Sequence, residues 1–478
     1  MAVNAPSITI PLCVDLNGTL IRSDLLFESA LLLIKRNPVY LLLMLWWLLR
    51  GKAALKAHIA SRVRLNPAGL PYNRDFVSWL KAERQGGRSL WLCTASNEHL
   101  ASAVAEHLNL FDGVIANDSG VNLAGNLKAV RLVERFGEHG FDYCGNERRD
   151  LAIWRYAHGA IVANARASVE RDAARDSVIL RSFPPCSRTW CSVLRALRPH
   201  QWAKNTLIVV PLLAAHRAGD QGALIAVTLA VAAFCLCASS VYVLNDMLDL
   251  EADRSHPRKS KRPFAAGDLS ILTGFALIPI LLGSSALIAA FLPVRFQLAF
   301  ATYYVLTMAY SFDLKGRVII DALSLAGLYT LRIISGAAAV NVPLSFWLLL
   351  FSVFLFQSLA LVKRYAELDL MRRQQQLRAA GRGYHVEDLV LLQSFGIASG
   401  YLSVLVLALY IDSPAIQTLY QRPKVIWLLC ILMLYWISYV WMKARRGEMH
   451  DDPVVFALKD RISLMVGLLA LVTVIAAI

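Results

Sequence analysis

A run of acidic side chains occupies residues 245–253, which read Asn-Asp-Met-Leu-Asp-Leu-Glu-Ala-Asp after a long apolar stretch. If that stretch continues as a helix, Asp246, Asp249 and Asp253 fall at i, i+3 and i+7 on one face. Three carboxylates at a helix C-terminus repel one another and oppose the helix dipole, so they need a cation. Because Mg²⁺ binds through carboxylates together with substrate phosphates, the segment predicts an Mg²⁺ site for a phosphate-bearing substrate. A solvated acidic helix end is the alternative.

Later segments carry charge at positions that favour a second half of such a site. Arg332 lies inside an apolar run, where an ionisable residue marks a functional site by default; an ion pair with Asp321 or another acid is the structural alternative. The sequence Gly381-Arg382-Gly383 lets backbone amides approach a phosphate closely while the arginine supplies charge. Residues 450–461 are dense in charge and either cap the site or anchor the last helix.

The first third of the chain places a separate set of polar residues at strand ends. We expect strands or strand-to-loop elements at residues 8–14, 90–96, 141–150 and 160–164. Asp15 follows the first strand, Thr94 lies in the second, Lys128 opens a helical stretch, and Asp150 closes the third element. Strands that alternate with helices predict a doubly wound α/β domain. Folds of this class build active sites at the C-terminal ends of their strands.

The composition separates a soluble part from a membrane part. Of the 478 residues 57% are hydrophobic, yet the net charge is +15, which is ordinary for a membrane protein with basic cytoplasmic loops. Charged and apolar residues mix as far as about residue 182, and long apolar runs dominate from residue 205. We therefore predict an all-α polytopic membrane bundle of about nine transmembrane helices. Their approximate limits are 204–218, 222–249, 270–292, 296–312, 319–340, 344–363, 388–411, 424–442 and 460–478.

Lysine and arginine residues are distributed unequally between the loops that join these spans. If the front domain is cytoplasmic, the inward loops hold most of the cations, and the outward loops offer little beyond Arg217, Arg295 and Arg422. The inward loops are then 250–269, 313–318, 364–387 and 443–459. The positive-inside rule predicts that the front domain and the active site lie on the cytoplasmic side of the inner membrane. Charges in loops between spans do not indicate nucleic-acid binding.

The expected domains follow from these patterns. They are a front domain at residues 1–183 with a helical cap at about 25–84, a Pro-Pro linker at 184–193, and a membrane domain at 194–478. Within the cap, residues 39–49 are apolar but too short to span a bilayer. They form either a buried cap helix or a helix on the membrane surface, with Arg50, Lys52 and Lys56 towards the headgroups.

The front domain resembles the haloacid dehalogenase superfamily of phosphatases and phosphotransferases. The resemblance covers about residues 8–183. It implies that Asp15 accepts the phosphoryl group and that Asp150 helps bind Mg²⁺. It also implies that Thr94 and Lys128 hold the phosphate.

Two asparagines depart from this family's pattern. Family phosphatases carry an acid/base aspartate two residues after the nucleophile, and that position is Asn17 here. Because an amide cannot shuttle a proton, turnover should suffer. Asn146 also stands where an aspartate is usual. The resemblance therefore implies a degenerate or slow phosphatase.

The motif Asn-Asp-x-x-Asp-x-x-x-Asp at residues 245–253, with nine predicted spans, resembles the UbiA superfamily of intramembrane prenyl-group enzymes. The resemblance runs from about residue 194 to the C-terminus. The segments 197–205, 310–315, 363–367, 381–384 and 451–454 look like the decaprenyl-phosphate phosphoribosyltransferase branch. That branch transfers 5-phosphoribose from phosphoribosyl pyrophosphate to a polyprenyl phosphate and releases pyrophosphate. Its product feeds arabinofuranose donors for cell-envelope glycans.

The resemblance implies a role for each part of the site. Asp246, Asp249 and Asp253 would bind Mg²⁺, and Asn245 would orient the pyrophosphate. Substrate-binding roles are implied for Lys204, Arg254, Lys261, Arg262, Tyr310, Lys315, Asp321, Arg332, Lys363, Arg382 and Tyr384. The implied partners are phosphoribosyl pyrophosphate, polyprenyl phosphate and the lipid bilayer, and a homo-oligomer is compatible with the sequence.

Two other functions stay open on the sequence. One is transfer from a polyprenyl diphosphate to an aromatic acceptor, in which the acidic helix would serve the lipid's own diphosphate. That function leaves the Gly-Arg-Gly loop and the number of inward cations underused. The other is a non-catalytic membrane sensor whose two domains only bind phosphorylated ligands. The degenerate front domain favours the sensor, and the complete aspartate motif argues against it.

Overall fold

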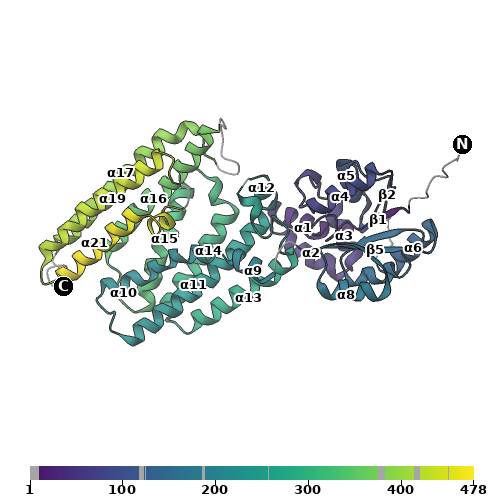
Figure 1. Cartoon of the computed structure of the whole chain (residues 1–478). Coiled ribbons are helices and arrows are strands. Elements are labelled where there is room, and N and C mark those ends of the chain that lie inside the picture. Colours follow the sequence, from purple (N-terminus) through teal and green to yellow (C-terminus); the bar gives the residue numbers. More distant parts are fainter. Residues whose placement is uncertain are drawn as a thin grey trace. The chain divides into compact units, whose positions relative to one another are not determined.

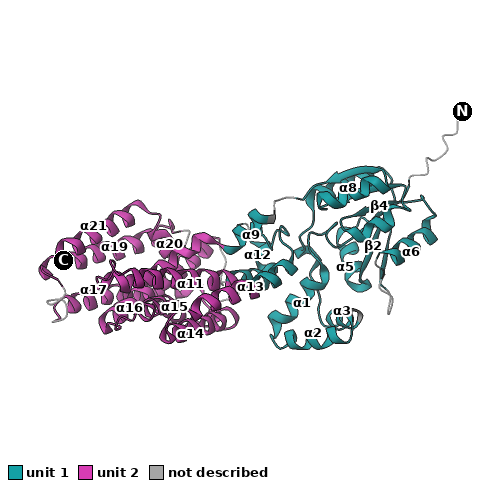
Figure 2. Cartoon of the chain, turned by 90° about the horizontal axis from the view of Figure 1, so that it is seen from below, with its two compact units in different colours: residues 1–197, 242–278 teal, residues 198–241, 279–478 magenta. Residues whose placement is uncertain are grey.

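The computed structural model describes residues 10–117, 123, 125–185, 189–256, 258–374, 383–413, 420–449 and 452–478. Its internal contacts divide the chain into two compact units (Figure 2). Unit 1 comprises residues 1–197 and 242–278, and unit 2 comprises residues 198–241 and 279–478. The acidic segment 245–253 therefore belongs to the same unit as the front domain, although the sequence places it with the membrane domain.

A six-stranded parallel sheet forms the centre of the front domain (Figure 1). The strand order is β3-β2-β1-β4-β5-β6, so the chain starts in the middle and builds outward on both sides. The strands are β1 (Leu12–Val14), β2 (Leu90–Asn97), β3 (Gly113–Asn117), β4 (Asp142–Gly145), β5 (Gly159–Ala163) and β6 (Ile179–Phe183). The parallel α/β sheet expected from the sequence is present, with β3 and β6 as additional strands.

Helices cover both faces of this sheet because alternate strand residues point to opposite sides. In β1, Leu12 and Val14 belong to a core with α4 (Arg74–Gln85) and α5 (Glu98–Leu108). Cys13 points into the opposite core. That core contains side chains from α6 (Asn126–Phe136), α7 (Leu151–Trp154) and α8 (Ala167–Asp176). The sheet is thus buried on both faces.

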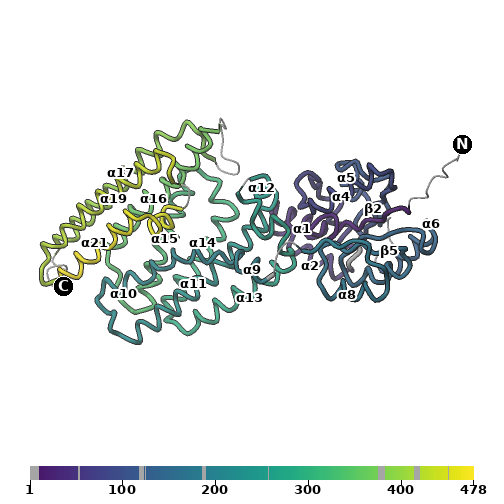
Figure 3. The backbone as a smooth tube through the Cα atoms, viewed as in Figure 1, coloured from purple at the N-terminus to yellow at the C-terminus, as the bar shows by residue number. Residues whose placement is uncertain are grey.

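Three helices follow β1 before the chain returns to the sheet through α4 (Figure 3). They are α1 (Leu25–Arg36), α2 (Tyr40–Leu49) and α3 (Lys52–Ala60). The side chain of Asp24 caps α1 by accepting a hydrogen bond from the Leu26 amide at 2.8 Å. Buried residues of α1, α2 and α3 share one apolar cluster with Leu248. These three helices form the cap, whereas α4 packs on the sheet.

The remainder of unit 1 surrounds the acidic segment. It contains α9 (Thr189–Leu197), which begins inside the expected linker, the end of α11 (Gln221–Leu248), α12 (Leu250–Ser255) and the start of α13 (Ile271–Ala290). Leu31 of α1 lies in one buried cluster with Val243, Met247 and Leu250. The cap is therefore packed directly against the segment that carries the aspartates.

A buried ion pair joins the two at the centre of this contact. Arg254 of α12 donates from Nη2 to Glu28 Oε1 at 2.6 Å and from Nη1 to Glu28 Oε2 at 3.1 Å. The same guanidinium donates to the carbonyls of Gly69 and Ala265 at 3.2 and 3.1 Å. The two charged side chains are only 10% and 5% exposed. Each buried charge is therefore stabilised by the opposite charge of its partner.

Unit 2 is an all-helical bundle. Its helices are α10 (Val210–Ala214), α14 (Val294–Phe312), α15 (Ile320–Ala339), α16 (Phe346–Arg373), α17 (Leu389–Ile411), α19 (Leu428–Arg445), α20 (Pro453–Ala457) and α21 (Arg461–Ala477), with parts of α11 and α13. Within the described residues, six helices are long and apolar enough to cross a membrane. They lie at Gln221–Leu248, Ile271–Ala290, Ile320–Ala339, Phe346–Arg373, Val386–Ile411 and Pro423–Arg445.

Nine transmembrane helices are thus not confirmed. The spans expected at 296–312 and 460–478 correspond to α14 and α21, which fall outside the six. The span expected at 204–218 is not one helix, because a 3₁₀ helix over Pro199–Val209 precedes the five-residue α10. Gly336 of α15 lies so close to this turn that a Cβ would meet the Ile208 carbonyl oxygen at 2.1 Å. A short, tightly packed element therefore replaces a span.

Replacing Glu28 by alanine should loosen the contact between α1 and α12. A guanidinium left buried without its carboxylate costs about 3–5 kcal/mol. Backbone amides of α1 and α12 in the full-length protein should then exchange hydrogen roughly 100-fold faster or more. The control is Asp172→Ala, which removes the partner of Arg175 from a 3.9 Å pair with 81% and 37% exposed side chains. Exchange rates that match between Glu28→Ala and this control would contradict the role of the ion pair.

Candidate active sites

The acidic segment is not the single helix that the sequence predicts. Helix α11 ends at Leu248 and α12 begins at Leu250, with Asp249 between them at φ −101° and ψ 16°. The break turns the segment at its middle aspartate. Asp246 and Asp253 still share a partner, whereas Asp249 forms a salt bridge with Lys35 of α1 at 3.5 Å. Asp249 therefore contacts a different cation from the one that Asp246 and Asp253 share.

Arg262 supplies the cation between the outer two aspartates. Its Nη1 donates to Asp246 Oδ1 at 3.1 Å and to Asp253 Oδ2 at 2.6 Å. Both carboxylates are almost fully buried, at 2% and 4% side-chain exposure. The side-chain oxygen of Asn245 is buried and accepts no hydrogen bond from any described residue. One guanidinium nitrogen thus occupies the position between two carboxylates where the sequence predicts a metal.

These residues fit Mg²⁺ by the chemistry of their donors. Two carboxylates and an amide oxygen form an all-oxygen set, which hard cations prefer. Among the described residues, however, no three His, Cys, Asp or Glu side chains converge closely enough to hold a metal ion. Asp249 points to Lys35 instead. An ion bound here would therefore use Asp246 and Asp253 and leave other positions to water or substrate.

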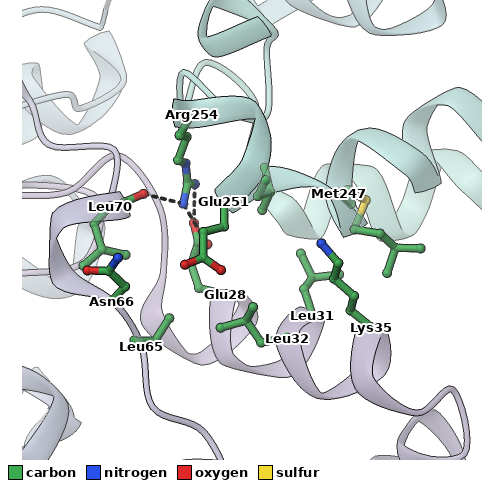
Figure 4. A pocket seen from close by; sticks show the side chains of 13 residues that line it. Glu28, Leu31, Leu32, Lys35, Leu65, Asn66, Leu70, Met247, Glu251 and Arg254 are labelled. Atoms are coloured by element: carbon green, nitrogen blue, oxygen red, sulfur yellow. Dashed lines mark hydrogen bonds and ion pairs between the residues drawn. The ribbon is translucent and has the colours of Figure 1, made fainter. Parts of the chain in front are cut away.

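Residues of the cap and of the acidic segment line one pocket (Figure 4). The figure shows Glu28 of α1 beside Glu251 and Arg254 of α12, and Lys35 further along α1 towards Met247. Arg254 was expected to bind substrate, but Glu28 and two carbonyls already hold its guanidinium. Its role in the structure is to attach the cap. Lys261, the other cation expected nearby, is exposed.

Asp452 gathers two of the predicted lysines in unit 2. Its Oδ2 accepts hydrogen bonds from Lys204 Nζ at 2.8 Å and Lys363 Nζ at 3.0 Å. Its Oδ1 accepts from the Tyr329 hydroxyl at 3.0 Å and the Val454 amide at 3.2 Å. Burial favours the protonated acid, but Lys363 and Lys204 hold the pKa of Asp452 well below its usual value. Two ammonium groups on one carboxylate leave a net positive charge, which suits a phosphate.

Arg332 is buried in unit 2 among neutral acceptors. It donates from Nε to Asn205 Oδ1 at 2.9 Å and from Nη1 to the Leu328 carbonyl at 2.7 Å. Its Nη2 donates to the Tyr303 hydroxyl at 3.0 Å, and the guanidinium lies 4.9 Å from the Tyr303 ring centre. These contacts fix the direction of the positive charge inside the bundle.

Asp321 is paired with Arg364, so the alternative pairing with Arg332 is not what the structure shows. The Arg364 Nη2 and the Tyr310 hydroxyl donate to Asp321 Oδ1 at 3.2 and 2.8 Å, and Arg364 Nε contacts Oδ2. Arg364 also binds Glu367 at 2.5 Å. Both members of the Asp321–Arg364 pair are nearly inaccessible to solvent. This pair joins α15 to α16.

The three remaining predicted substrate residues of unit 2 are Lys315, Tyr384 and Arg382. Lys315 is half-buried in a short 3₁₀ turn. The Tyr384 hydroxyl accepts a hydrogen bond from the Ile319 amide at 2.9 Å, so it supports the backbone before α15. Arg382 lies outside the described residues.

The front domain brings its four predicted residues to one edge of the sheet. Lys128 Nζ donates to Asp15 Oδ1 at 2.7 Å and to the Tyr143 hydroxyl at 3.0 Å. That hydroxyl donates to Asp150 Oδ1 at 3.2 Å. Burial raises the pKa of Asp15 to about 7, with the nearby Asp150 charge adding to the effect and Lys128 opposing it. Thr94 is buried within β2 and directly follows Cys93, whose carbonyl accepts a hydrogen bond from Lys128 Nζ at 3.3 Å.

Asn17 makes structural hydrogen bonds with both ends of its side-chain amide. Its Nδ2 donates to Ser96 Oγ at 3.0 Å, and its Oδ1 accepts from the Leu25 amide at 3.2 Å. The residue therefore holds the start of α1 against the end of β2. Asn146 lies close to Gly18, whose φ is +77° and where a Cβ would meet the Asn146 side chain at 2.1 Å.

Sequence reasoning missed several residues that the structure brings to these sites. They are Glu28, Lys35, Tyr143, Asn205, Tyr303, Tyr329, Arg364 and Asp452. Asp452 lay in a segment noted for its charge, and Arg364 directly follows a predicted site lysine. Glu28 and Lys35 carried no signal, since they are charged residues on an ordinary helix.

Comparison with known proteins gives matches along almost the whole chain. Residues 206–467 match the UbiA prenyltransferase family. The protein y4nM of Sinorhizobium fredii is 35% identical over 465 residues, covering 96% of this chain and 89% of that protein. The nodulation protein NoeC of Azorhizobium caulinodans is 37% identical over 282 residues, covering 58% of this chain and 89% of NoeC.

A relative whose name states an activity matches a shorter part of this chain. The decaprenyl-phosphate phosphoribosyltransferase of Mycolicibacterium smegmatis is 38% identical over 187 residues. The match covers 38% of this chain and 58% of that enzyme, so it spans just over half of the enzyme's length.

Proposed function

Because the chain belongs to the UbiA prenyltransferase family, we propose that it transfers 5-phosphoribose from phosphoribosyl pyrophosphate to a polyprenyl phosphate. Family membership and six apolar helices make it a multi-pass membrane protein. The observation that carries the proposal is the buried pair of carboxylates, Asp246 and Asp253, bridged by one guanidinium nitrogen. Similarity to decaprenyl-phosphate phosphoribosyltransferases supports the choice of donor and acceptor.

The acidic segment would bind the pyrophosphate end of the donor. Bound Mg²⁺ would offset the charge that develops on the departing pyrophosphate. Asp246 and Asp253 provide oxygen ligands, and Asn245 has a buried oxygen that can accept from a ligand or bound water. Arg262, released from the two carboxylates, would then face a phosphate with its guanidinium. We expect an oxocarbenium-like transition state at the ribose C1, by analogy with glycosyl transfer.

The acceptor needs cations rather than a base. A lipid phosphate is already ionised, so no protein group has to remove its proton. Lys204 and Lys363 on Asp452, with Arg332 in the same unit, supply positive charge that can bind this phosphate. The excess of lysine and arginine in the expected inward loops supports a cytoplasmic site in the inner membrane.

The experiment that tests this function uses purified full-length protein in nanodiscs with labelled phosphoribosyl pyrophosphate and Mg²⁺. Adding decaprenyl phosphate should release pyrophosphate and form a lipid-linked ribose phosphate. A second arm offers a polyprenyl diphosphate with an aromatic acceptor, and a third offers each ligand alone. Product only in the second arm would favour prenyl transfer instead. Binding without product in every arm would favour a sensor.

Asp246→Asn should reduce lipid-dependent pyrophosphate release at least about 100-fold, because an amide cannot neutralise the metal that stabilises the leaving group. Removing Mg²⁺ with a chelator should have the same effect on the wild type. Asp268→Asn is the matched control, since Asp268 pairs with Arg195 at 3.0 Å outside the acidic segment. Its rate should stay within about threefold of the wild type. Near-normal, Mg²⁺-dependent release by Asp246→Asn would show that the site is misplaced.

For the front domain we propose a slow phosphatase of the haloacid dehalogenase type that retains phosphate and Mg²⁺ binding. Asp15, Lys128 and Asp150 are connected through hydrogen bonds at the end of β1, which supports a phosphate site. The Asn17 amide is committed to Ser96 and Leu25 and has no proton to exchange. The product of the membrane reaction carries a 5-phosphate, and fusion would hold it at high effective concentration.

Asn17→Asp should raise phosphate release from the lipid-linked ribose phosphate by up to about 10²–10⁴-fold, because it restores a proton carrier. The change is sterically mild, since a carboxylate can accept from both Ser96 and the Leu25 amide. Adding Asp15→Asn to this variant should abolish the gain. Robust release by the wild type that disappears in Asp15→Asn would instead show an efficient phosphatase.

A further inference from the structure

Helix α2 turns most of its apolar residues outward. It reads Tyr-Leu-Leu-Leu-Met-Leu-Trp-Trp-Leu-Leu and contains no charged residue. Only Met44 and Trp47, one turn apart, are buried. The exposed fractions on the rest of the helix include 67% for Leu42, 57% for Leu45 and 86% for Leu49. A soluble domain seldom leaves so continuous an apolar surface open to water.

The buried side of α2 connects it to the end of a predicted span. Met44 and Trp47 share their apolar cluster with Leu248, the last residue of α11, and with the partly buried Leu244 and Phe275. Helix α11 is one of the six helices long enough to cross a membrane. The end of such a helix lies at the level of the lipid headgroups. The outward face of α2 is therefore within one helix diameter of the boundary between headgroups and acyl chains.

The charge around α2 complements an anionic surface. From Ser29 to Arg74 the sequence has no acidic residue and eight lysines and arginines. The guanidinium of Arg50 lies 3.7 Å from the centre of the Trp46 ring, at the exposed end of the helix. Arginine and tryptophan in contact are typical of the headgroup region, where each keeps a polar part in water. Lys56 does not join them, because its ammonium donates to the Ala95 carbonyl at 3.2 Å.

We propose that α2 is a membrane-surface helix that inserts into the bilayer holding the chain's own spans. Its ten residues measure about 15 Å as a helix, which is half of the hydrocarbon thickness, so it lies in the plane of the membrane. The leucines enter the boundary of the acyl chains, and Arg50 binds headgroup phosphates. The helix thereby holds the cap of the front domain on the membrane surface, independently of which reaction the acidic segment performs.

The test places a fluorophore on α2 in the full-length protein. In a Cys186→Ser, Cys191→Ser background, Leu45→Cys is labelled with NBD and reconstituted into nanodiscs of phosphatidylcholine and phosphatidylglycerol. The matched control is Leu127→Cys on α6, because Leu127 is 56% exposed and Leu45 is 57% exposed. Lipids with a nitroxide on the acyl chain should quench the label at Leu45 at least about threefold more than the label at Leu127, and iodide in the water should do the reverse.

Two further outcomes decide the proposal. Adding Leu42→Asp, at a position that is 67% exposed, should bring quenching at Leu45 down to the control level. Equal quenching at Leu45 and Leu127 without this change would overturn the proposal. Protection of Leu45 from both lipid nitroxide and iodide would also overturn it, because that pattern indicates a second copy of the chain covering α2.

Discussion

The ion pair between Glu28 and Arg254 determines how the front domain and the acidic segment are arranged within unit 1. A charge that is nearly excluded from water is tolerated only beside its counter-charge. Separating Arg254 from Glu28 therefore costs free energy. The hydrogen bonds from the guanidinium to the Gly69 and Ala265 carbonyls fix the direction from which Arg254 approaches Glu28. The hydrogen bonds of the Arg254 guanidinium therefore hold the short helix α12 against the cap. Asp253 directly precedes that arginine, so its position depends on the cap as well.

The second link, from Lys35 to Asp249, has a different character. At 3.5 Å, with side chains 44% and 31% exposed, it contributes little to stability. This salt bridge matters for the chemistry of the site, because a lysine of the front domain pairs with the middle aspartate of the motif. A ligand that drew Asp249 towards a metal would have to release Lys35, while the Glu28–Arg254 pair stayed closed. The acidic segment thus has one fixed attachment and one that can exchange.

Local sequence patterns predicted most of the helices and strands but few of the partners of the charged side chains. The strand ends at Asp15 and Thr94 and eight of the helices in the membrane part could be predicted from periodicity and hydropathy, because burial repeats along each element. The partners of Arg254, Arg332 and Asp321 could not. Their partners Glu28, Asn205 and Arg364 lie 226, 127 and 43 residues away in sequence. A chain rich in arginine also offers an acid such as Asp321 many equally charged candidates. The break at Asp249 was hidden for a related reason, since packing of α12 against the cap, rather than local propensity, bends the segment.

Unit 1 is discontinuous in sequence, and this affects how the protein is made. Arg254 is added 57 residues after Leu197 (254 − 197), which is roughly 3–11 s at the usual rate of synthesis. During that interval the α/β sheet is complete, but Glu28 has no counter-charge and Leu31 of α1 lacks the α11 and α12 residues that cover it. Closure must also wait until α11 has entered the bilayer. The nascent front domain therefore passes through an intermediate in which the apolar surface that later packs against α11 and α12 is still uncovered.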